Sequence, residues 1–180
     1  MKMSNIEKRV PVLYLDLDGT VRHGATELGR FVNSAADVVV FSEVPSLLAR
    51  YKRFGWRIVA VSNQGGIALG HMSMDDCIEA MGATNKQSGD AFDKMLWCPH
   101  HPDAKDPEMS VCWCRKPRPG LIIEGALALR IMNPFEMYPP HMGLMVGDRP
   151  EDAAAAGNAG LRFLDAATWR TGEHLLSLTS

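Results

Sequence analysis

The sequence predicts an α/β fold, in which a doubly wound parallel sheet forms one domain over residues 1–180. Short apolar runs, such as VPVLYLDL at 10–17, are typical of parallel strands that are buried on both faces. These runs alternate with segments that carry helix start and stop signals, which is the order of β-α-β units. A chain of 180 residues is also long enough to bury one full hydrophobic core.

The first predicted strand, at 10–17, leads into a segment at 20–42 that contains Gly, Ala and Asn residues. We expect this segment to be mostly loop. A helix is predicted at 43–54, because Ser42 is a favourable N-cap and Gly55 a favourable stop.

The second strand is predicted at 56–61 and is followed by a glycine-rich loop at 63–70. Ser73 then has the position of an N-cap for the next helix, whose first turn is acidic. A weaker strand pattern follows at 91–97.

The segment 98–119 contains five prolines and no hydrophobic period, so we expect an irregular loop. A helix is predicted at 120–132, beginning after Pro119. Strands at 143–146 and 161–164, with a short alanine-rich helix at 150–156 between them, complete the sheet. In such sheets the ligand binds beyond the carboxyl ends of the strands, where the strand order reverses.

Charge and hydropathy favour a cytoplasmic protein. The formal net charge is −2, which gives no general attraction to nucleic acid or anionic membranes. The longest apolar runs are far too short to span a bilayer, and residues 1–9 lack the pattern of a signal peptide. We also expect a monomer.

Polar clusters at the ends of predicted strands indicate phosphoryl transfer. Asp16 is a candidate nucleophile that forms an aspartyl-phosphate, and Asp18 is a candidate general acid and base on the same side of the strand end. Ser62 and the backbone of Asn63 can donate hydrogen bonds to phosphate. Lys116 can neutralise the phosphate and hold Asp16 in position.

Carboxylates from separate strands also suggest a magnesium site. Asp16, Asp148 and an oxygen of Asp18, through its backbone carbonyl, form a hard oxygen set of the kind that Mg²⁺ prefers. Two interpretations of Asp152 are open, because an acid in a first helical turn either supports the metal ligands or serves the helix dipole.

Cysteines and a histidine cluster in the irregular loop. Cys98, His100, Cys112 and Cys114 form a Cys₃His set, which is typical of structural zinc sites. Spacing alone leaves His101 open as an alternative to His100. A bound zinc ion would order a loop that has no core of its own.

These motifs resemble the haloacid dehalogenase superfamily of phosphatases, with DLDGT at 16–20, SNQ at 62–64, the lysine at 116 and GD at 147–148. The stretch CPHHP…CWCRKPRPG at 98–120 resembles the zinc-containing branch, which includes heptose-1,7-bisphosphate 7-phosphatases and histidinol-phosphate phosphatases. The resemblance implies zinc ligation by the Cys₃His set and phosphate contacts from Arg115 and Lys116. The short gaps between motifs predict no separate cap domain and an open site.

The substrate is less well defined by the sequence. We expect a small phosphorylated metabolite such as a heptose bisphosphate, with histidinol phosphate as an alternative. However, the sequence VRHGA at 21–25 departs from the heptose enzymes, so Arg22 and His23 either bind a second phosphate or are solvated loop residues. This loop and Gln64 are similar to the phosphatase part of polynucleotide kinase-phosphatases, which keeps 3′-phosphorylated nucleic acid open, with support from Arg30 and other arginines.

We therefore take five residues as candidate contacts to substrate, namely Asn63, Gln64, Arg115, Arg22 and His23. A different class of function, a non-catalytic zinc-stabilised binding module, is disfavoured because both Asp16 and Asp18 are present.

Overall fold

A computed structural model describes residues 10–25, 32–129 and 143–178 of the chain. Its centre is a five-stranded sheet in the order β5-β4-β1-β6-β7, and every neighbouring pair is parallel. The strands are β1 (Val12–Leu15), β4 (Arg57–Asn63), β5 (Lys94–Cys98), β6 (Gly143–Gly147) and β7 (Arg162–Asp165). The predicted α/β class and parallel sheet are confirmed.

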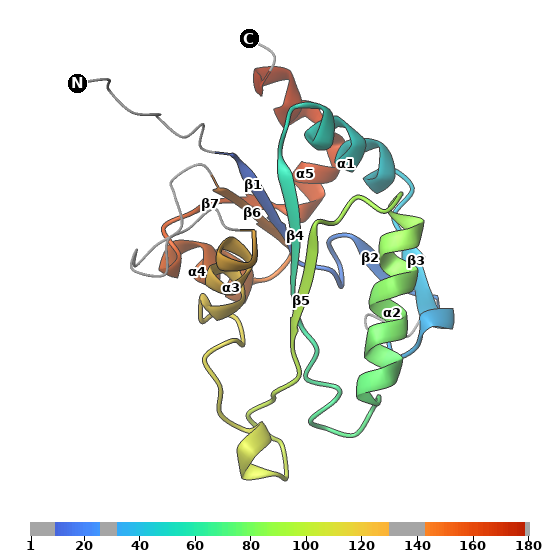
Figure 1. Cartoon of the computed structure of the whole chain (residues 1–180), viewed down its shortest axis with the longest axis vertical. Helices are drawn as coiled ribbons and strands as arrows, with labels where there is room; N and C mark the ends of the chain where they lie inside the picture. The colour runs from blue at the N-terminus through green and yellow to red at the C-terminus, as the bar shows by residue number, and fades with distance from the viewer. Residues whose placement is uncertain (1–9, 26–31, 130–142, 179–180) are drawn as a thin grey trace, which may run out of the picture.

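Helices cover both faces of this sheet (Figure 1). On one face lie α1 (Val44–Arg53), α2 (Met74–Gln87) and α5 (Ala166–Thr171), and on the other lie α3 (Gly120–Ala128) and α4 (Pro150–Asn158). Strand β1 shows why both layers form. Its alternate residues Leu13 and Leu15 pack into the first core, whereas Val12 and Tyr14 pack into the second.

Local signals set the ends of two helices on the first face. Ser73 caps α2, as the sequence predicts, and the structure adds a reciprocal capping box with Asp76. Helix α1 begins at Val44 with Glu43 as its N-cap, so the prediction of Ser42 was one residue early. Gly55 follows its end with φ of 79°, a left-handed conformation that glycine adopts without steric cost.

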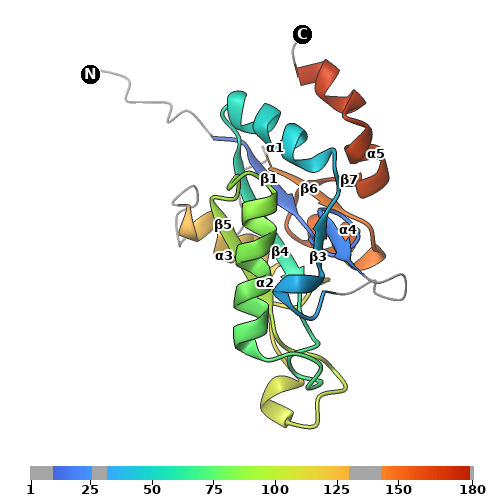
Figure 2. The same cartoon turned by 90° about the vertical axis from the view of Figure 1, so that its right-hand side faces the viewer.

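The segment predicted as loop at 20–42 contains two short strands. These are β2 (Arg22–Gly24) and β3 (Val38–Val40), which pair antiparallel beside α2 (Figure 2). Gln87 of α2 hydrogen-bonds the backbone of β3 at Val38 and Val40. Long-range pairing with a helix 47 to 49 residues away explains why local sequence did not reveal these strands.

Helix α5 was also missed, because it is only six residues long. Asp165 caps its first turn, Trp169 anchors it in the first core, and Gly172 ends it with φ of 72°. The predicted helix at 120–132 is observed over Gly120–Ala128, and residues 130–132 lie outside the described part.

The loop after β5 is irregular, as predicted, and contains one short 3₁₀ helix at Pro107–Met109. Within the described residues, the segments between β1, β4 and β6 form no separate cap domain. None of the helices in this part of the chain has the length and apolar character needed to cross a membrane.

Candidate functional site

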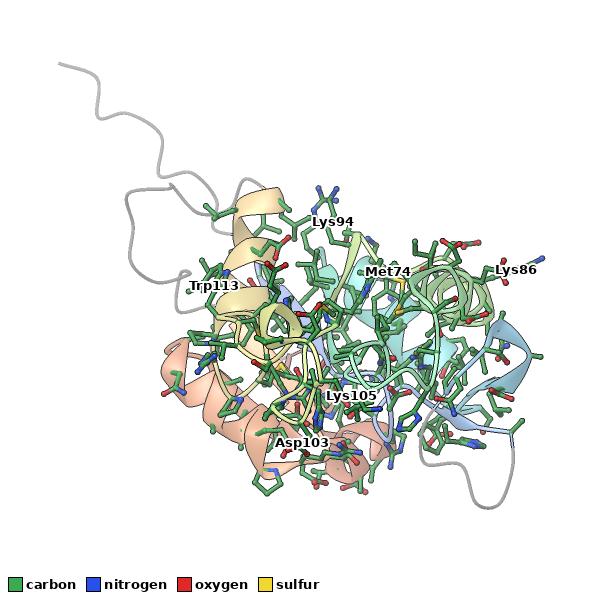
Figure 3. The ribbon with its side chains drawn as sticks, turned by 90° about the horizontal axis from the view of Figure 1, so that it is seen from below. Met74, Lys86, Lys94, Asp103, Lys105 and Trp113 are labelled. Atoms are coloured by element: carbon green, nitrogen blue, oxygen red, sulfur yellow. The ribbon has the colours of Figure 1, made fainter. Side chains whose placement is uncertain are left out.

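The predicted catalytic residues converge at the carboxyl edge of the sheet. The chain runs outward from β1 to β5 on one side and returns to β6 on the other, so the strand order reverses at β1. Figure 3 views this lower end of the molecule, where Asp103, Lys105 and Trp113 mark the loop after β5. A pocket there is lined by Asp16, Asp18, Ser62, Asn63, Lys116, Arg149, Glu151 and Asp152.

Lys116 forms ion pairs with two buried carboxylates in this pocket. Its Nζ lies 2.5 Å from Asp16 Oδ1 and 2.6 Å from Asp152 Oδ1. Burial alone lowers the pKa of Lys116, but the two carboxylates outweigh it and hold this pKa above its ordinary value. Burial raises the pKa of Asp16 to about 7, although Lys116 opposes the shift. The ammonium is therefore a fixed positive charge beside Asp16.

Three carboxylates are close enough to share one cation. Ligand oxygens of Asp16, Asp148 and Asp152 all lie within 4.8 Å of one another. Among the described residues, Asp148 Oδ1 is buried and has no hydrogen-bond partner, and burial raises the pKa of this carboxyl. A hard divalent cation suits an all-oxygen group that includes a buried carboxylate oxygen without a hydrogen bond, so the donor set fits magnesium.

Asp152 combines both interpretations that the sequence left open. Its Oδ2 accepts a hydrogen bond from the backbone N–H of Arg149 at the start of α4, as a first-turn acid does. Its Oδ1 faces Lys116, and the residue belongs to the three-carboxylate group. The Asp18 side chain is absent from this group, so only the predicted role of its backbone carbonyl is compatible with the geometry.

A glycine brings the turn after β1 against the carboxylates. Gly19 has φ of 92°, and a Cβ placed there would lie 2.2 Å from Asp148 Oδ2. Any side chain at this position would displace the Asp148 carboxylate. Arg170 of α5 supports the same turn, because its Nη1 donates hydrogen bonds to the carbonyls of Gly19 and Thr20 at 2.9 and 3.0 Å.

Asp18 is held at both carboxylate oxygens. Arg22 Nε donates to Oδ1 at 2.9 Å, and Gln64 Nε2 donates to Oδ2 at 2.8 Å. The Gln64 amide nitrogen also lies 2.8 Å from Ser62 Oγ. Gln64, predicted to bind substrate, thus uses its side-chain amide to hold two pocket residues, Asp18 and Ser62.

Asn63 holds the chain that carries the lysine. Its side-chain amide donates to the Lys116 carbonyl at 3.1 Å and accepts from the Lys116 backbone N–H at 3.0 Å. The sequence prediction gave Asn63 a substrate contact and did not anticipate this pairing. No local pattern indicates it, since the two residues are 53 positions apart.

Arg22 does not lie as either sequence interpretation expects, whereas the substrate contact of His23 stays a prediction. The Arg22 side chain has no exposed surface, so it is neither a solvated charge nor accessible to a second phosphate, and its prediction as a substrate contact is wrong. His23 is half-buried against Phe41, with ring centroids 5.0 Å apart, and its Nδ1 lies 2.9 Å from the Gly24 carbonyl. Arg30 lies outside the described residues.

Two further residues line the pocket, namely Arg149, which the sequence analysis counted among the arginines that favour nucleic acid, and Glu151, which the sequence prediction missed. Both residues flank Pro150 directly after the Gly-Asp motif, and this position in the sequence is a signal that they lie near the site. Arg115 lies near the glycine-rich loop, since a Cβ at Gly65 would be 3.0 Å from its Nη1. The same Nη1 donates to the His100 carbonyl at 3.0 Å.

The predicted Cys₃His set is assembled in the loop after β5. The ligand atoms of Cys98, His100, Cys112 and Cys114 lie within 4.8 Å of one another. Cys98 Sγ is 3.5 Å from Cys112 Sγ and 3.5 Å from His100 Nδ1. Ligand atoms on a tetrahedral zinc ion lie about 3.5–3.8 Å apart, so the cluster fits zinc.

The cluster also decides between the two histidines and connects to the pocket. His101 Nδ1 instead accepts a hydrogen bond from the backbone N–H of Asp103, which leaves His100 as the ligand. The Arg115 backbone N–H donates to Cys112 Sγ at 3.3 Å, one residue before Lys116. An ion at this cluster would therefore fix the chain that presents the lysine.

Curated proteins that are similar to this chain in sequence are phosphatases. The chain is 34% identical over 165 residues to a D-glycero-beta-D-manno-heptose-1,7-bisphosphate 7-phosphatase of Salmonella typhi, covering 87% of this chain and 81% of that protein. The corresponding phosphatase of Escherichia coli K12 is 33% identical, with coverage of 87% and 80%. No family model matches the chain.

Solved structures give the same result. A D,D-heptose 1,7-bisphosphate phosphatase from B. bronchiseptica, complexed with magnesium and phosphate, is 25% identical with a TM-score of 0.68, covering 86% of this chain and 79% of that one. A HAD-like phosphatase from Mesorhizobium loti is 26% identical with a TM-score of 0.72, covering 89% and 74%.

Proposed function

The chain belongs to the family of D-glycero-beta-D-manno-heptose-1,7-bisphosphate 7-phosphatases in the haloacid dehalogenase superfamily, and from this premise we propose that it hydrolyses a sugar bisphosphate through a phosphorylated Asp16. One observation carries the catalytic part of the proposal. Asp16 is 6% exposed, faces the pocket, and is paired with a buried lysine beside two further carboxylates. Such a grouping suits a carboxylate nucleophile next to a cation-binding position.

In the first step, an Asp16 carboxylate oxygen attacks phosphorus and the bond to the leaving oxygen breaks. Lys116 favours the ionised nucleophile and fixes its orientation through the contact with Oδ1. Asp18 lies two residues further along the turn, held by Arg22 and Gln64. It donates a proton to the departing alkoxide, which leaves as an alcohol.

In the second step, water attacks the phosphorus of the aspartyl-phosphate and Asp18 accepts the proton of that water. The Asp16–phosphate bond breaks, inorganic phosphate leaves, and the Asp16 carboxylate is restored. Ser62 Oγ and the backbone N–H of Asn63 are the proposed donors to the phosphate oxygens, since both residues line the pocket.

The metals have different proposed roles. Magnesium held by Asp16, Asp148 and the carbonyl of Asp18, with Asp152 beside them, would neutralise phosphate charge among several carboxylates. Zinc on Cys98, His100, Cys112 and Cys114 would be structural, because all four positions of a tetrahedron are taken by protein ligands.

The substrate proposal rests on the relatives, which are named as heptose bisphosphate phosphatases. Arg149 lines the pocket and Arg115 lies beside the glycine-rich loop, where a second phosphate of such a substrate would need cations. Because Arg22 is buried, one of the arginines that favoured nucleic acid no longer supports that alternative. A single domain over residues 1–180, a monomeric state and a cytoplasmic location remain predictions from the sequence.

A substrate screen tests this proposal. Heptose 1,7-bisphosphate, histidinol phosphate and a 3′-phosphorylated oligonucleotide would be compared with Mg²⁺, and phosphate release would be measured. We expect the highest kcat/KM on the bisphosphate, and no turnover of any substrate by Asp16→Asn. Faster turnover of the oligonucleotide or of histidinol phosphate would reject the substrate, and activity of Asp16→Asn would reject the nucleophile.

A further inference from the structure

The charged side chain of Arg22 lies in the interior of the protein. It is among the largest fully buried side chains, with no exposed surface. Nε donates to Asp18 Oδ1 at 2.9 Å, and Nη1 donates to Thr84 Oγ1 at 2.7 Å and to the Ala80 carbonyl at 3.3 Å. The guanidinium thus joins the turn after β1 to helix α2.

Stability alone gives no reason for an arginine here. Among the described residues, Nη2 is buried without a hydrogen-bond partner, so its desolvation is uncompensated. Buried ion pairs are often no more stabilising than apolar residues of the same volume. A charge at this position is therefore better explained by what it does to Asp18.

The anchor on α2 is well suited to fixing a direction. Thr84 donates its own hydroxyl hydrogen to the Ala80 carbonyl at 2.7 Å, so its oxygen is aligned to accept from Arg22. Both residues lie inside a regular helix, at Met74–Gln87. These helix contacts do not involve Asp18, so they can hold the guanidinium in place in both protonation states of that carboxyl.

Lys116 and Arg22 pair with different carboxylates of the pocket. Lys116 pairs with Asp16 and Asp152, whereas Arg22 pairs with Asp18. The nucleophile and the acid are thus oriented by separate cations from separate elements. Gln64, on the second oxygen, leaves Asp18 little freedom to rotate.

We propose that Arg22 is a positioning residue, which acts through Asp18 and holds that carboxyl at the leaving-group oxygen from its anchor on α2. The inference rests on the proposed function, in which Asp18 is the general acid. Arg22 itself touches no substrate, because its side chain is fully enclosed. Its loss should therefore affect proton donation and leave substrate binding nearly unchanged.

Two substrates with different leaving groups distinguish a positioning role of Arg22 from a general loss of structure. The 7-phosphate of heptose 1,7-bisphosphate leaves as an alkoxide that needs a proton, whereas p-nitrophenyl phosphate leaves as a stable phenolate that does not. First-turnover release of each leaving group would be measured by rapid quench. This readout is independent of the later hydrolysis of the aspartyl-phosphate, in which Asp18 also takes part.

We expect Arg22→Met to slow alkyl release about 10- to 100-fold, with aryl release within about threefold of wild type and KM nearly unchanged. Arg22→Lys, which restores a cation, should regain part of the alkyl rate. The matched control Arg53→Met removes an exposed arginine from α1 and should behave as wild type. Equal losses on both leaving groups, or no loss on either, would overturn the proposal.

Thr84→Val provides a second test that keeps the ion pair and the contact with the Ala80 carbonyl but removes the shorter contact of the anchor on α2. We expect a smaller loss, again confined to the alkyl ester. If Arg22→Met does not fold, this variant decides, and a loss on both esters or on neither overturns the proposal. Wild-type protein that releases neither leaving group would instead contradict the proposed function itself.

Discussion

Substituting methionine for Lys116 removes the one charge that lies between two buried carboxylates. Its Nζ is 2.5 Å from Asp16 and 2.6 Å from Asp152, and each contact has a Coulomb energy of about 6 kcal/mol at an effective dielectric constant near 20. The desolvation of the ammonium itself offsets several kcal/mol of this attraction. The net loss of stability on removing the lysine is therefore much smaller than the sum of the two Coulomb energies.

Protonation sets an upper bound on that loss. Without the lysine, Asp16 can stay buried as a neutral acid, since its ordinary pKa is 3.8 and burial already raises it to about 7. Protonating such a carboxyl costs about 4 kcal/mol at pH 7. We therefore expect Lys116→Met to lower the free energy of unfolding by about 3–4 kcal/mol and the melting temperature by roughly 6–16 °C.

Urea denaturation and thermal melts in Mg²⁺-free buffer measure this effect. Lys94→Met is the matched control, because it removes an exposed lysine from β5 and should change stability by less than about 0.5 kcal/mol. Adding Asp152→Asn to Lys116→Met removes one of the two carboxylates and should recover about 1–3 kcal/mol. A Lys116→Met protein within 1 kcal/mol of wild type, or a double variant with no recovery, would refute the shared ion pair.

Three further predictions concern the glycine turn, the thiolate cluster and pH. Gly19→Ala should reduce kcat about 100-fold and weaken Mg²⁺ binding, since the added Cβ would meet the carboxylate of Asp148. The control Gly55→Ala is also at positive φ but in open space, so it should lower only the melting temperature. Elemental analysis of the Cys114→Ser protein should find no bound zinc, and both its stability and its turnover should be lower than those of wild type. The control Cys77→Ser changes a buried cysteine outside the cluster, so this protein should still contain zinc. The pKa of Asp16 is raised in the metal-free fold, so the stability that its protonation contributes is present below about pH 4 and is lost as the pH rises through 7. Urea titrations from pH 5 to 8 should show this loss of stability without Mg²⁺ and a smaller loss with Mg²⁺.

Local sequence was sufficient for the features that depend on local chemistry. The apolar run before Asp16 predicted a buried strand, and β1 lies there. The cysteines and His100 predicted one cluster, because a proline-rich loop with no core of its own needs another source of order. Strand ends met at one edge, as the parallel arrangement requires, which brought Asp16 and Asp148 together.

Features that depend on distant partners were not predictable in this way. The buried Arg22 side chain donates a hydrogen bond to Thr84, 62 residues later, on helix α2. The amide of Asn63 meets the backbone of Lys116 across 53 residues. Both side chains are polar and follow strand ends, so the sequence could suggest that they serve the site but not that they act by holding its catalytic groups.

Chemical trapping of the phosphorylated residue tests the central claim most directly. Borohydride reduces an aspartyl-phosphate to homoserine, so enzyme quenched during turnover would be reduced, digested and sequenced by mass spectrometry. We predict homoserine at position 16 when substrate and Mg²⁺ are present, and none when substrate is omitted. Reduction at another carboxylate such as Asp148, or unmodified Asp16 in enzyme that is actively releasing phosphate, would contradict the account.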